Sequence, residues 1–534
     1  METKVLKTVL FVTFFIFIVS IFANINWGAP FYFHPDERNI ASSISQLNFP
    51  NNFNPHFFAY GSFPIYSAFI IGAIPQLLSG NFNNLTVSFS DAIIITRIFS
   101  SLLSVLLILL IYKTTKFIAG EKQALLASIL GSSSVGFLQF SNFGTFEMWL
   151  SALSLLIVFL LLKFMKTNNT KLLIYSSILF GLLVSLKLSF ATFFLIFIFV
   201  LITTSTKKLS NKTKLFLILI STILISYVVF APFNLMDLPS FLSSMNYEGT
   251  VATGTLQVFY TGGFLNTIPI AYQYQNVFPF VLNPLITLLS IPAIFYMSYI
   301  SIKKKDYELG LIVFSFLIVF ISQGILFVKW TRYVIPSLSF IYILISIFLF
   351  KIENKFGKYI FYTILTLLIG ISFIFEFSFL RTVRLANDTR LTAADFAKNN
   401  IPQNARIISE VYDLGILPFN ENFPHITLFN FYDLDNNQDQ IHVLQSQFKD
   451  YDYFIIPSQR IVQSRFANSG NFPVGYNFYK NLFDENLGYK KIYETPCDIF
   501  CRIIYMGNPT LNLEQTASVF DRPTVFIFKR YRKN

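Results

Sequence analysis

Charged residues are scarce in this sequence. Only 13% of its 534 residues are Asp, Glu, Lys or Arg, whereas 54% are hydrophobic. A water-soluble protein of this length needs more polar side chains to cover its surface. Repeated apolar runs of the length that spans a bilayer occur instead. The scarcity of charge therefore excludes a soluble enzyme and indicates an integral membrane protein with several spans.

Glycine-rich nucleotide loops and basic soluble modules are missing as well. The segment after residue 380 contains no phosphate-cradling glycine loop. The formal net charge is +12, but no soluble segment carries the basic face that nucleic-acid binding requires. The missing basic face excludes nucleic acid as a partner.

Eleven apolar segments are interpreted as membrane-spanning helices. The first lacks a convincing small-residue cleavage site and more spans follow it, so we expect an uncleaved helix rather than a signal peptide. The segment 63–79 is also apolar, but Pro64 and Pro75 interrupt it, and we expect it to lie along the interface. The expected spans are residues 8–24, 92–112, 123–140, 147–163, 172–186, 188–204, 214–232, 277–300, 307–327, 333–350 and 359–379.

Lysine marks alternate connections between these segments. Lysine-rich connections are short, whereas the others are long, aromatic and nearly free of lysine. Because cytoplasmic loops carry the excess of positive charge, we predict a multi-pass protein of the cytoplasmic membrane with a cytoplasmic N-terminus. The polar segments 25–91, 233–276 and 380–534 are then extracytoplasmic. The lysines concerned are Lys4, Lys7, Lys113, Lys116, Lys122, Lys163, Lys166, Lys171, Lys207, Lys208, Lys212, Lys214, Lys303, Lys304, Lys305, Lys351, Lys355 and Lys358.

The C-terminal segment 381–534 is expected to form a small extracytoplasmic α/β domain. DTRLTAADFAKNNIP is typical of a helix, with Thr392 as a candidate cap, and ARIISEVY, YDYFIIPS and PTVFIFKRY are candidate strands. The only cysteines, Cys497 and Cys501, lie here. An oxidising compartment favours a disulfide between them, and two free thiols are the alternative.

Charged side chains concentrate at the expected outer ends of the helices. Charges near a bilayer are costly, so each needs a reason. Interfacial anchoring or mutual ion pairing explains any one of them, but together they place carboxylates and cations at one depth. The residues concerned are Asp36, Glu37, Arg97, Glu147, Lys187 and Arg332.

Such a cluster suits transfer of a sugar from a lipid phosphate. A carboxylate beside cations can act as a base, and cations can hold a phosphate. Sugars on polyprenyl phosphate reach the outer leaflet, where an acceptor hydroxyl can attack the anomeric carbon. The departing phosphate monoester needs little protonation, so one base suffices, whereas glycoside hydrolysis uses two carboxyls.

Several motifs resemble the C-type (GT-C) glycosyltransferases, specifically the protein O-mannosyltransferase-like branch. They are HPDERNIA, NPHFFAYGSFPIYS, ITRIFSSLLS, SNFGTFEMW, GLLVSLKLSFATFF and RYVIP, in this order. The resemblance covers about residues 1–380, and YDYFIIPSQR and VFDRPTVFIFKR resemble the extension of some bacterial members. It implies a mainly α, GT-C-like bundle of about eleven spans with a catalytic loop at 25–91.

The resemblance also assigns roles to individual residues. Asp36 matches the catalytic acidic residue and would be the general base, with Glu37 orienting the acceptor or the loop. Glu147 stands where the family usually has Asp, and Asn142 replaces a common histidine of that motif. Arg332 matches the arginine that contacts the lipid phosphate. Lys187 and Arg97 are further candidate phosphate ligands.

Four residues are candidates for the substrate pocket: His34, His56, Tyr60 and Tyr333. The two histidines raise the question of a divalent metal, but shaping of the loop and hydrogen bonding explain them as well. The branch resembled is not known for a required metal. We therefore expect no cofactor.

The sequence thus predicts transfer of a mannose-like hexose or related sugar from polyprenyl phosphate to an extracytoplasmic protein or envelope glycan or lipid, with inversion. A transporter or flippase of a lipid-linked glycan intermediate is the alternative. That alternative predicts ionisable groups at the midplane and repeated, broken helices.

Overall fold

The computed structural model describes residues 3–80, 82–204, 209–507 and 513–531. Two of the lysines used to predict the topology, Lys207 and Lys208, lie outside the described residues. The chain divides into two compact units. Unit 1 comprises residues 1–25, 36–255 and 269–377, and unit 2 comprises residues 26–35, 256–268 and 378–534.

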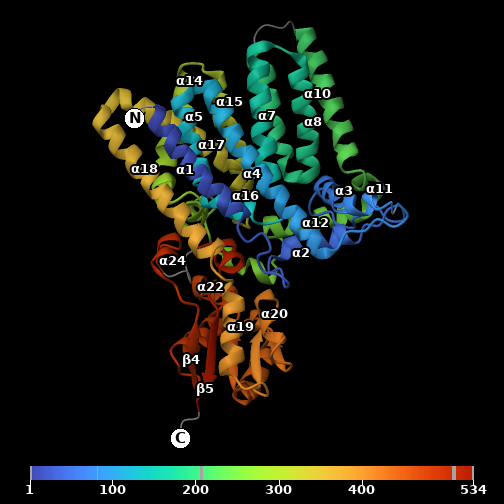
Figure 1. Ribbon diagram of the computed structural model, residues 1–534, viewed down its shortest axis with the longest axis vertical. Helices are drawn as coiled ribbons and strands as arrows, with labels where there is room; N and C mark the ends of the chain where they lie inside the picture. The colour runs from blue at the N-terminus through green and yellow to red at the C-terminus, as the bar shows by residue number, and fades with distance from the viewer. Residues whose placement is uncertain (1–2, 81, 205–208, 508–512, 532–534) are drawn as a thin grey trace. The chain divides into compact units, whose positions relative to one another are not determined.

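Unit 1 is a bundle of long apolar helices (Figure 1). Its helices before residues 256–268 are α1 (Thr3–Phe22), α2 (Pro35–Ser45), α3 (Ser62–Leu78), α4 (Phe89–Ala119), α5 (Glu121–Ser132), α6 (Val135–Ser141), α7 (Glu147–Thr167), α8 (Thr170–Leu186), η1 (Leu188–Phe194), α9 (Leu195–Thr203), α10 (Leu209–Phe230), α11 (Phe233–Met236) and α12 (Leu238–Thr253). Those after these residues are η3 (Gln273–Val277), α13 (Phe278–Val281), α14 (Pro284–Lys303), α15 (Tyr307–Gly324), α16 (Thr331–Val334), η4 (Ile335–Ser337), α17 (Leu338–Phe356) and α18 (Lys358–Phe379).

The number of spans is smaller than the eleven expected. Within the described residues, eight helices are long and apolar enough to cross a membrane, or nine if the bent pair α5 and α6 is one span. The expected spans 172–186 and 188–204 form the apolar helices Thr170–Leu186 and Leu188–Thr203, which meet at Lys187 and are too short to count among the eight. The segment 63–79 also forms a short apolar helix, α3.

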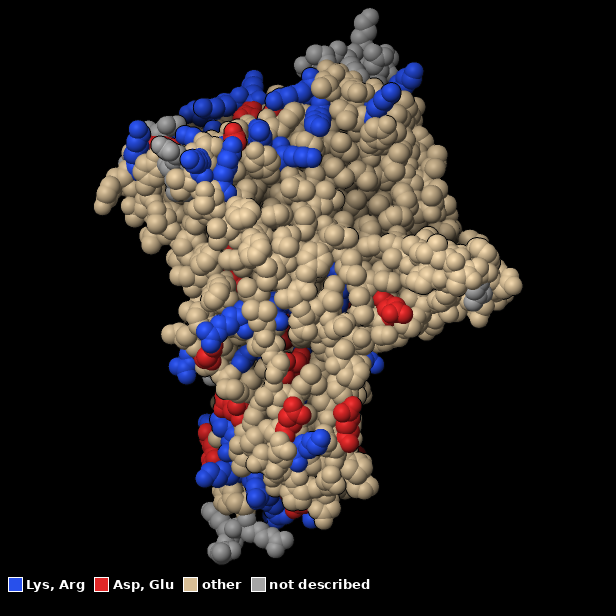
Figure 2. Space-filling model, in the orientation of Figure 1, with Lys and Arg blue, Asp and Glu red and all other residues tan. Residues whose placement is uncertain are grey.

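The lysine-rich connections lie together at one end of the helices of unit 1. Lys7, at the start of α1, pairs with Glu121 at the start of α5 at 3.0 Å. Lys166, at the end of α7, pairs with Glu308 at the start of α15 at 3.4 Å. Figure 2 shows basic side chains gathered along this edge of unit 1. The alternation found in the sequence therefore corresponds to two chemically distinct ends of one bundle.

Unit 2 contains a five-stranded sheet in the order β2-β1-β3-β5-β4. Strands β1, β2 and β3 are parallel, and β5 runs antiparallel to β3 and β4. The three strands expected from the sequence are β1, β3 and β5, and the structure adds β2 and β4. The strands are β1 (Ile407–Glu410), β2 (Ile426–Phe429), β3 (Tyr453–Ile456), β4 (Tyr489–Glu494) and β5 (Phe526–Arg530).

Helices pack on the sheet of unit 2 through two apolar clusters. One cluster contains Phe431, Phe454 and Tyr479, and the other contains Ala393 and Ile455. The longer helices are α19 (Thr389–Asn400), α21 (Gln438–Gln447), α22 (Arg460–Ala467), α23 (Pro473–Phe483) and α24 (Ile499–Ile504).

Helix α19 lies within the expected segment 388–402, but its cap is a different residue. Its cap is Asp388, whose carboxylate accepts a hydrogen bond from the backbone N–H of Arg390. The expected cap, Thr392, instead donates its hydroxyl to the carbonyl of Asp388. A disulfide joins Cys497 and Cys501 just before and within α24.

A glycine allows one extramembrane loop to contact the end of α8. The backbone N–H of Gly61 donates to the carbonyl of Leu186 at 3.0 Å. A Cβ at position 61 would lie 2.6 Å from the Cα of Leu186 and closer still to the carbonyl oxygen of Ser185. Only glycine permits this approach, which fixes Tyr60 and Lys187 on adjoining segments.

Substitution Gly61→Ala tests this contact. We expect a loss of about 1–3 kcal/mol in stability, because the new methyl group overpacks against backbone that cannot move aside. The measurement is the apparent melting temperature of the detergent-solubilised protein. Gly249→Ala is the matched control, since a Cβ there meets nothing within 4 Å. Equal melting temperatures for the two variants would contradict the close contact.

Candidate active site

Two adjacent acidic residues occupy the first turn of α2. Pro35 begins this helix, a position that suits its fixed φ and its missing N–H. Asp36 and Glu37 follow it, where a carboxylate is favoured by the helix dipole. Because consecutive residues are about 100° apart around a helix, the two side chains point in different directions and make different contacts.

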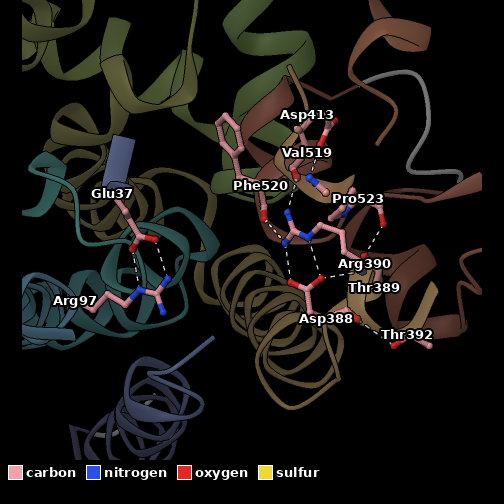
Figure 3. Close-up of polar contacts among 11 residues, drawn as sticks. Glu37, Arg97, Asp388, Thr389, Arg390, Thr392, Asp413, Val519, Phe520 and Pro523 are labelled. Carbon is pink, nitrogen blue, oxygen red and sulfur yellow. Dashed lines mark hydrogen bonds and ion pairs between the residues drawn. The ribbon is translucent and has the colours of Figure 1, made fainter. Parts of the chain in front are cut away.

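Glu37 forms a fully buried ion pair with Arg97 of α4 (Figure 3). Arg97 Nε and Nη2 each donate to one carboxylate oxygen at 2.8 Å. The backbone N–H of Gly144 donates to Glu37 Oε1 at 2.5 Å. Arg97 Nη1 donates to the carbonyl of Ile25 at 2.8 Å. The pair thus ties α2, α4 and the loop before α7 to one another.

This geometry gives Arg97 a role different from the expected phosphate contact. Its side chain is 1% exposed, and Nε, Nη1 and Nη2 all donate within the protein. Removing one partner of such a buried pair typically costs about 3–5 kcal/mol. We therefore assign Arg97 and Glu37 to positioning the first turn of α2.

Asp36 faces Arg332 at the start of α16. Arg332 Nη1 donates to Asp36 Oδ2 and, at 2.9 Å, to the hydroxyl of Tyr60. The two charged side chains are 25% and 19% exposed, so a ligand can reach them. Arg332 also stacks on Trp330, with 4.4 Å from Cζ to the ring centroid. Burial raises the pKa of Tyr60 well above its usual value, so this phenol stays neutral.

Lys187 brings a second cation to the same group of residues. It lies at the break between α8 and η1, and its Nζ is 4.1 Å from the ring centroid of Tyr333. Burial, reinforced by the neighbouring Arg332, lowers the pKa of Lys187 to about 8. Glu147, Glu248 and Asp36 oppose that shift, which means that three carboxylates act on this ammonium group.

Glu147 is a buried carboxylate at the start of α7. Its side chain is 1% exposed, and neither carboxylate oxygen has a hydrogen-bond partner among the described residues. The electrostatic partners are Lys187 and Arg332. Asn142, which stands where the related motif commonly has histidine, donates its amide to the carbonyl of Leu138. An unpaired buried carboxylate is costly, so Glu147 is a group that a bound ligand can satisfy.

Sequence reasoning missed Glu248 on α12. This residue interacts electrostatically with Arg332, Asp36 and Lys187, and burial raises its pKa. A signal was present in the sequence: Asp237 and Glu248 are the only charged residues in the extramembrane segment 233–276. An isolated carboxylate in such an apolar segment needs a functional or structural reason.

The expectation that His34 and His56 line the substrate pocket stays a prediction, and the structure gives the ring of each of them one described contact. His34 belongs to unit 2, where its ring centroid is 4.7 Å from that of Phe520. His56 is exposed, and its Nδ1 is 4.0 Å from the carboxylate of Asp237. Within the described ranges, no group of three or more His, Cys, Asp or Glu side chains could hold a metal ion. The expectation that no metal is required stays a prediction.

The site therefore combines two cations, three carboxylates and the two phenols of Tyr60 and Tyr333. Arg332 and Lys187 provide positive charge for an anionic group, and the fork of Arg332 suits phosphate oxygens. Asp36 is a partly exposed carboxylate beside that charge. This arrangement can hold a phosphate and accept a proton from a neighbouring hydroxyl.

Comparison with known proteins gives one family match. Residues 84–233 match a family described as dolichyl-phosphate-mannose-protein mannosyltransferase. The matched stretch contains Arg97, Glu147 and Lys187. No curated protein matches the chain.

Two solved structures of an archaeal enzyme share the fold over 98% of this chain. The archaeal oligosaccharyltransferase AglB from Archaeoglobus fulgidus, in complex with an inhibitory peptide and a dolichol-phosphate, is 13% identical with a TM-score of 0.52, covering 98% of this chain and 88% of its own. The A. fulgidus enzyme tethered to an acceptor peptide with the NVT sequon gives 12% identity, a TM-score of 0.52 and the same coverage. ArnT from Cupriavidus metallidurans in the apo state gives 12% identity and a TM-score of 0.46, covering 88% of this chain and 95% of its own.

The bundle of apolar helices, the five-stranded α/β unit, the likeness to AglB and the family match lead to one classification. The chain is a multi-pass integral membrane glycosyltransferase with the GT-C fold.

Proposed function

We propose that this enzyme transfers a single sugar, a mannose-like hexose or a related one, from polyprenyl phosphate to a hydroxyl of an extracytoplasmic acceptor. The observation that carries the proposal is the contact of Asp36 with Arg332, with Lys187 in the same electrostatic group. A base and a phosphate-binding cation are the two groups that this reaction needs. The family match to a dolichyl-phosphate-mannose enzyme supports the donor class.

Arg332 and Lys187 are the proposed ligands of the donor phosphate. Arg332 Nε is buried and has no hydrogen-bond partner among the described residues, so it can donate to a phosphate oxygen. Lys187 adds a second positive charge beside Tyr333. The complex of AglB with a dolichol-phosphate supports a lipid phosphate as the recognised group.

In the proposed reaction, Asp36 removes the proton of the acceptor hydroxyl as its oxygen attacks the anomeric carbon. A new carbon–oxygen bond forms on one face of the sugar, and the bond to the phosphate oxygen breaks on the other. The anomeric configuration is thereby inverted. The bonding electrons leave with polyprenyl phosphate, whose growing negative charge is stabilised by Arg332 and Lys187.

The proposed acceptor is a protein or an envelope glycan or lipid on the outer side of the cytoplasmic membrane. The lysines gather at one end of the bundle, which we take as the cytoplasmic end because positive charge is retained in the cytoplasm. This supports an acceptor on the outer side of the membrane. The peptide ligands in the AglB structures support a protein as one acceptor class.

Substitution Asp36→Asn tests the base. Loss of general base catalysis is expected to lower the transfer rate about 100-fold to 10,000-fold. Transfer from labelled mannosyl polyprenyl phosphate to endogenous acceptors is measured in membranes that contain the variant. Asp91→Asn is the matched control, because Asp91 is an exposed aspartate that bonds to Ser88 at the start of α4. Wild-type transfer by the Asp36 variant would remove the proposed base.

The pH dependence of donor binding tests Lys187. Because the pKa of Lys187 is lowered to about 8, its ammonium charge is present below pH 8 and lost as the pH rises through that value. The KM for the donor is therefore expected to rise about fivefold between pH 8 and pH 9, as one proton titrates in the free enzyme. The variant Lys187→Arg keeps its charge and should flatten this rise. A rise that persists unchanged in the arginine variant would assign the titration to another group.

Chemical labelling of single introduced cysteines tests whether the site faces the outside of the cell. Asn83, before α4, and Lys304, just after α14, are exposed and belong to connections that the lysine pattern assigns to opposite sides of the membrane. A membrane-impermeant maleimide added to intact cells should label Asn83→Cys and not Lys304→Cys. The native cysteines are joined in a disulfide and leave no background. Labelling of Lys304→Cys alone would place the site on the cytoplasmic side and contradict the use of a donor in the outer leaflet.

A further inference from the structure

Residues 26–35 connect α1 to the helix that carries the proposed base, and they pack within unit 2 rather than within the helical bundle. We infer that Arg390 of the C-terminal α/β unit is a positioning residue for Asp36, because it holds this segment in place. The inference rests on the proposed role of Asp36 as the base.

Arg390 is fixed along the whole edge of its guanidinium group (Figure 3). Its Nε and Nη2 donate to the two carboxylate oxygens of Asp388 at 2.9 and 2.7 Å. Nη2 also donates to the carbonyl of Phe520 at 3.0 Å, and Nη1 donates to that of Val519 at 3.4 Å. The side chain is buried, at 3% exposed. Its plane is therefore held in one orientation.

The guanidinium group of Arg390 lies over the rings of two aromatic residues of the 26–35 segment, Phe33 and Trp27. Arg390 Cζ is 3.9 Å from the ring centroid of Phe33 and 5.3 Å from that of Trp27. The two rings also meet edge to face, with 6.4 Å between their centroids. A guanidinium ion attracts aromatic faces, most strongly where water is excluded. Lysine cannot reproduce both the stacking and the bidentate pair with Asp388.

The next residue along the chain makes a contact in the same cluster. His34 packs its ring against Phe520 at 4.7 Å, and the carbonyl of Phe520 is one of the groups that bind Arg390. Tyr32 has a φ of 50°, in the left-handed region, a conformation that persists only when surrounding contacts impose it. Only Pro35 separates His34 from Asp36.

The two flanks of the segment are also fixed, and by a single residue. Arg97 binds the carbonyl of Ile25 before the segment and the carboxylate of Glu37 after it. The segment is therefore a loop closed at its base by Arg97 and held near its C-terminal end by Arg390. Asp36 lies on the short stretch between these two attachments, so its position depends on both.

Loss of Arg390 should affect the chemical step more than donor binding. Arg332 and Lys187, the proposed phosphate ligands, lie on α16 and at the break after α8, both in unit 1. Their contacts described above are all with residues of unit 1. A base displaced by about 1 Å can lower the rate about 100-fold. The expected signature is a lower kcat with an unchanged KM for the donor.

Arg465 provides a matched control within the same unit. It is 1% exposed, its Cζ is 4.0 Å from the ring centroid of Phe472, and its Nη2 donates to the carbonyl of Tyr432 at 2.8 Å. It resembles Arg390 in burial and stacking, but its partners lie outside residues 26–35. Arg465→Ala should destabilise the α/β unit without releasing the segment.

The experiment compares full-length Arg390→Ala, Arg390→Lys and Arg465→Ala with the wild type. Initial rates are measured with labelled mannosyl polyprenyl phosphate and normalised to folded protein, and hydrogen exchange is followed at residues 26–35. Arg390→Ala should lower kcat about 100-fold, keep the donor KM within about twofold, and speed exchange at 26–35 about tenfold. Arg390→Lys should be intermediate, and Arg465→Ala should change neither kcat nor exchange at 26–35.

Two results would overturn the inference. One is an Arg390→Ala variant with wild-type kcat. The other is an Arg465→Ala variant that loosens residues 26–35 as much as Arg390→Ala does. Asp36→Asn measured in parallel separates this inference from the proposed function. If Asp36→Asn is active, Asp36 is not the base. Hydrogen exchange at residues 26–35 then still decides whether Arg390 holds the segment.

Discussion

The buried pair of Glu37 and Arg97 is the interaction on which the geometry of the site depends. It fixes the first turn of α2 against α4, and through Gly144 against the loop that leads to Glu147. A charge pair with no exposed surface is stable only if every donor is used. Here the third guanidinium nitrogen binds the backbone at Ile25. The neighbouring Asp36 can therefore remain partly exposed on a helix whose first turn this pair anchors.

Adjacent carboxylates thus divide two tasks that one residue cannot combine. A carboxylate that anchors a helix has to be fully paired and dry, whereas a base has to meet its substrate. Because consecutive residues of a helix point in different directions, Glu37 can be buried while the adjacent Asp36 stays accessible. Charges that meet at the ends of the helices, rather than at their midpoints, also favour a transferase over the transporter that the sequence left open.

Much of the fold could be predicted because apolar length and lysine placement are properties of single segments. The expected helices 172–186 and 188–204 do form, although each is short, and strands β1, β3 and β5 lie within the three expected strand segments. The residues Asp36, Arg332, Tyr60, Lys187 and Tyr333 meet as a group. What could not be predicted depends on pairing across long chain separations. The sequence shows neither that Arg97 faces Glu37 nor that Glu248 reaches the cations, because no local pattern encodes either contact.

The division of the chain into units has a consequence for how such enzymes can diversify. The α/β unit is not a continuous cassette at the C-terminus, since residues 26–35 and 256–268 from two earlier loops belong to it. A recombination event that exchanged only the sequence after residue 378 would leave residues 26–35 and 256–268 packed against side chains that they do not fit. An exchange of the complete unit has to include residues 26–35 and 256–268 as well as the sequence after residue 378.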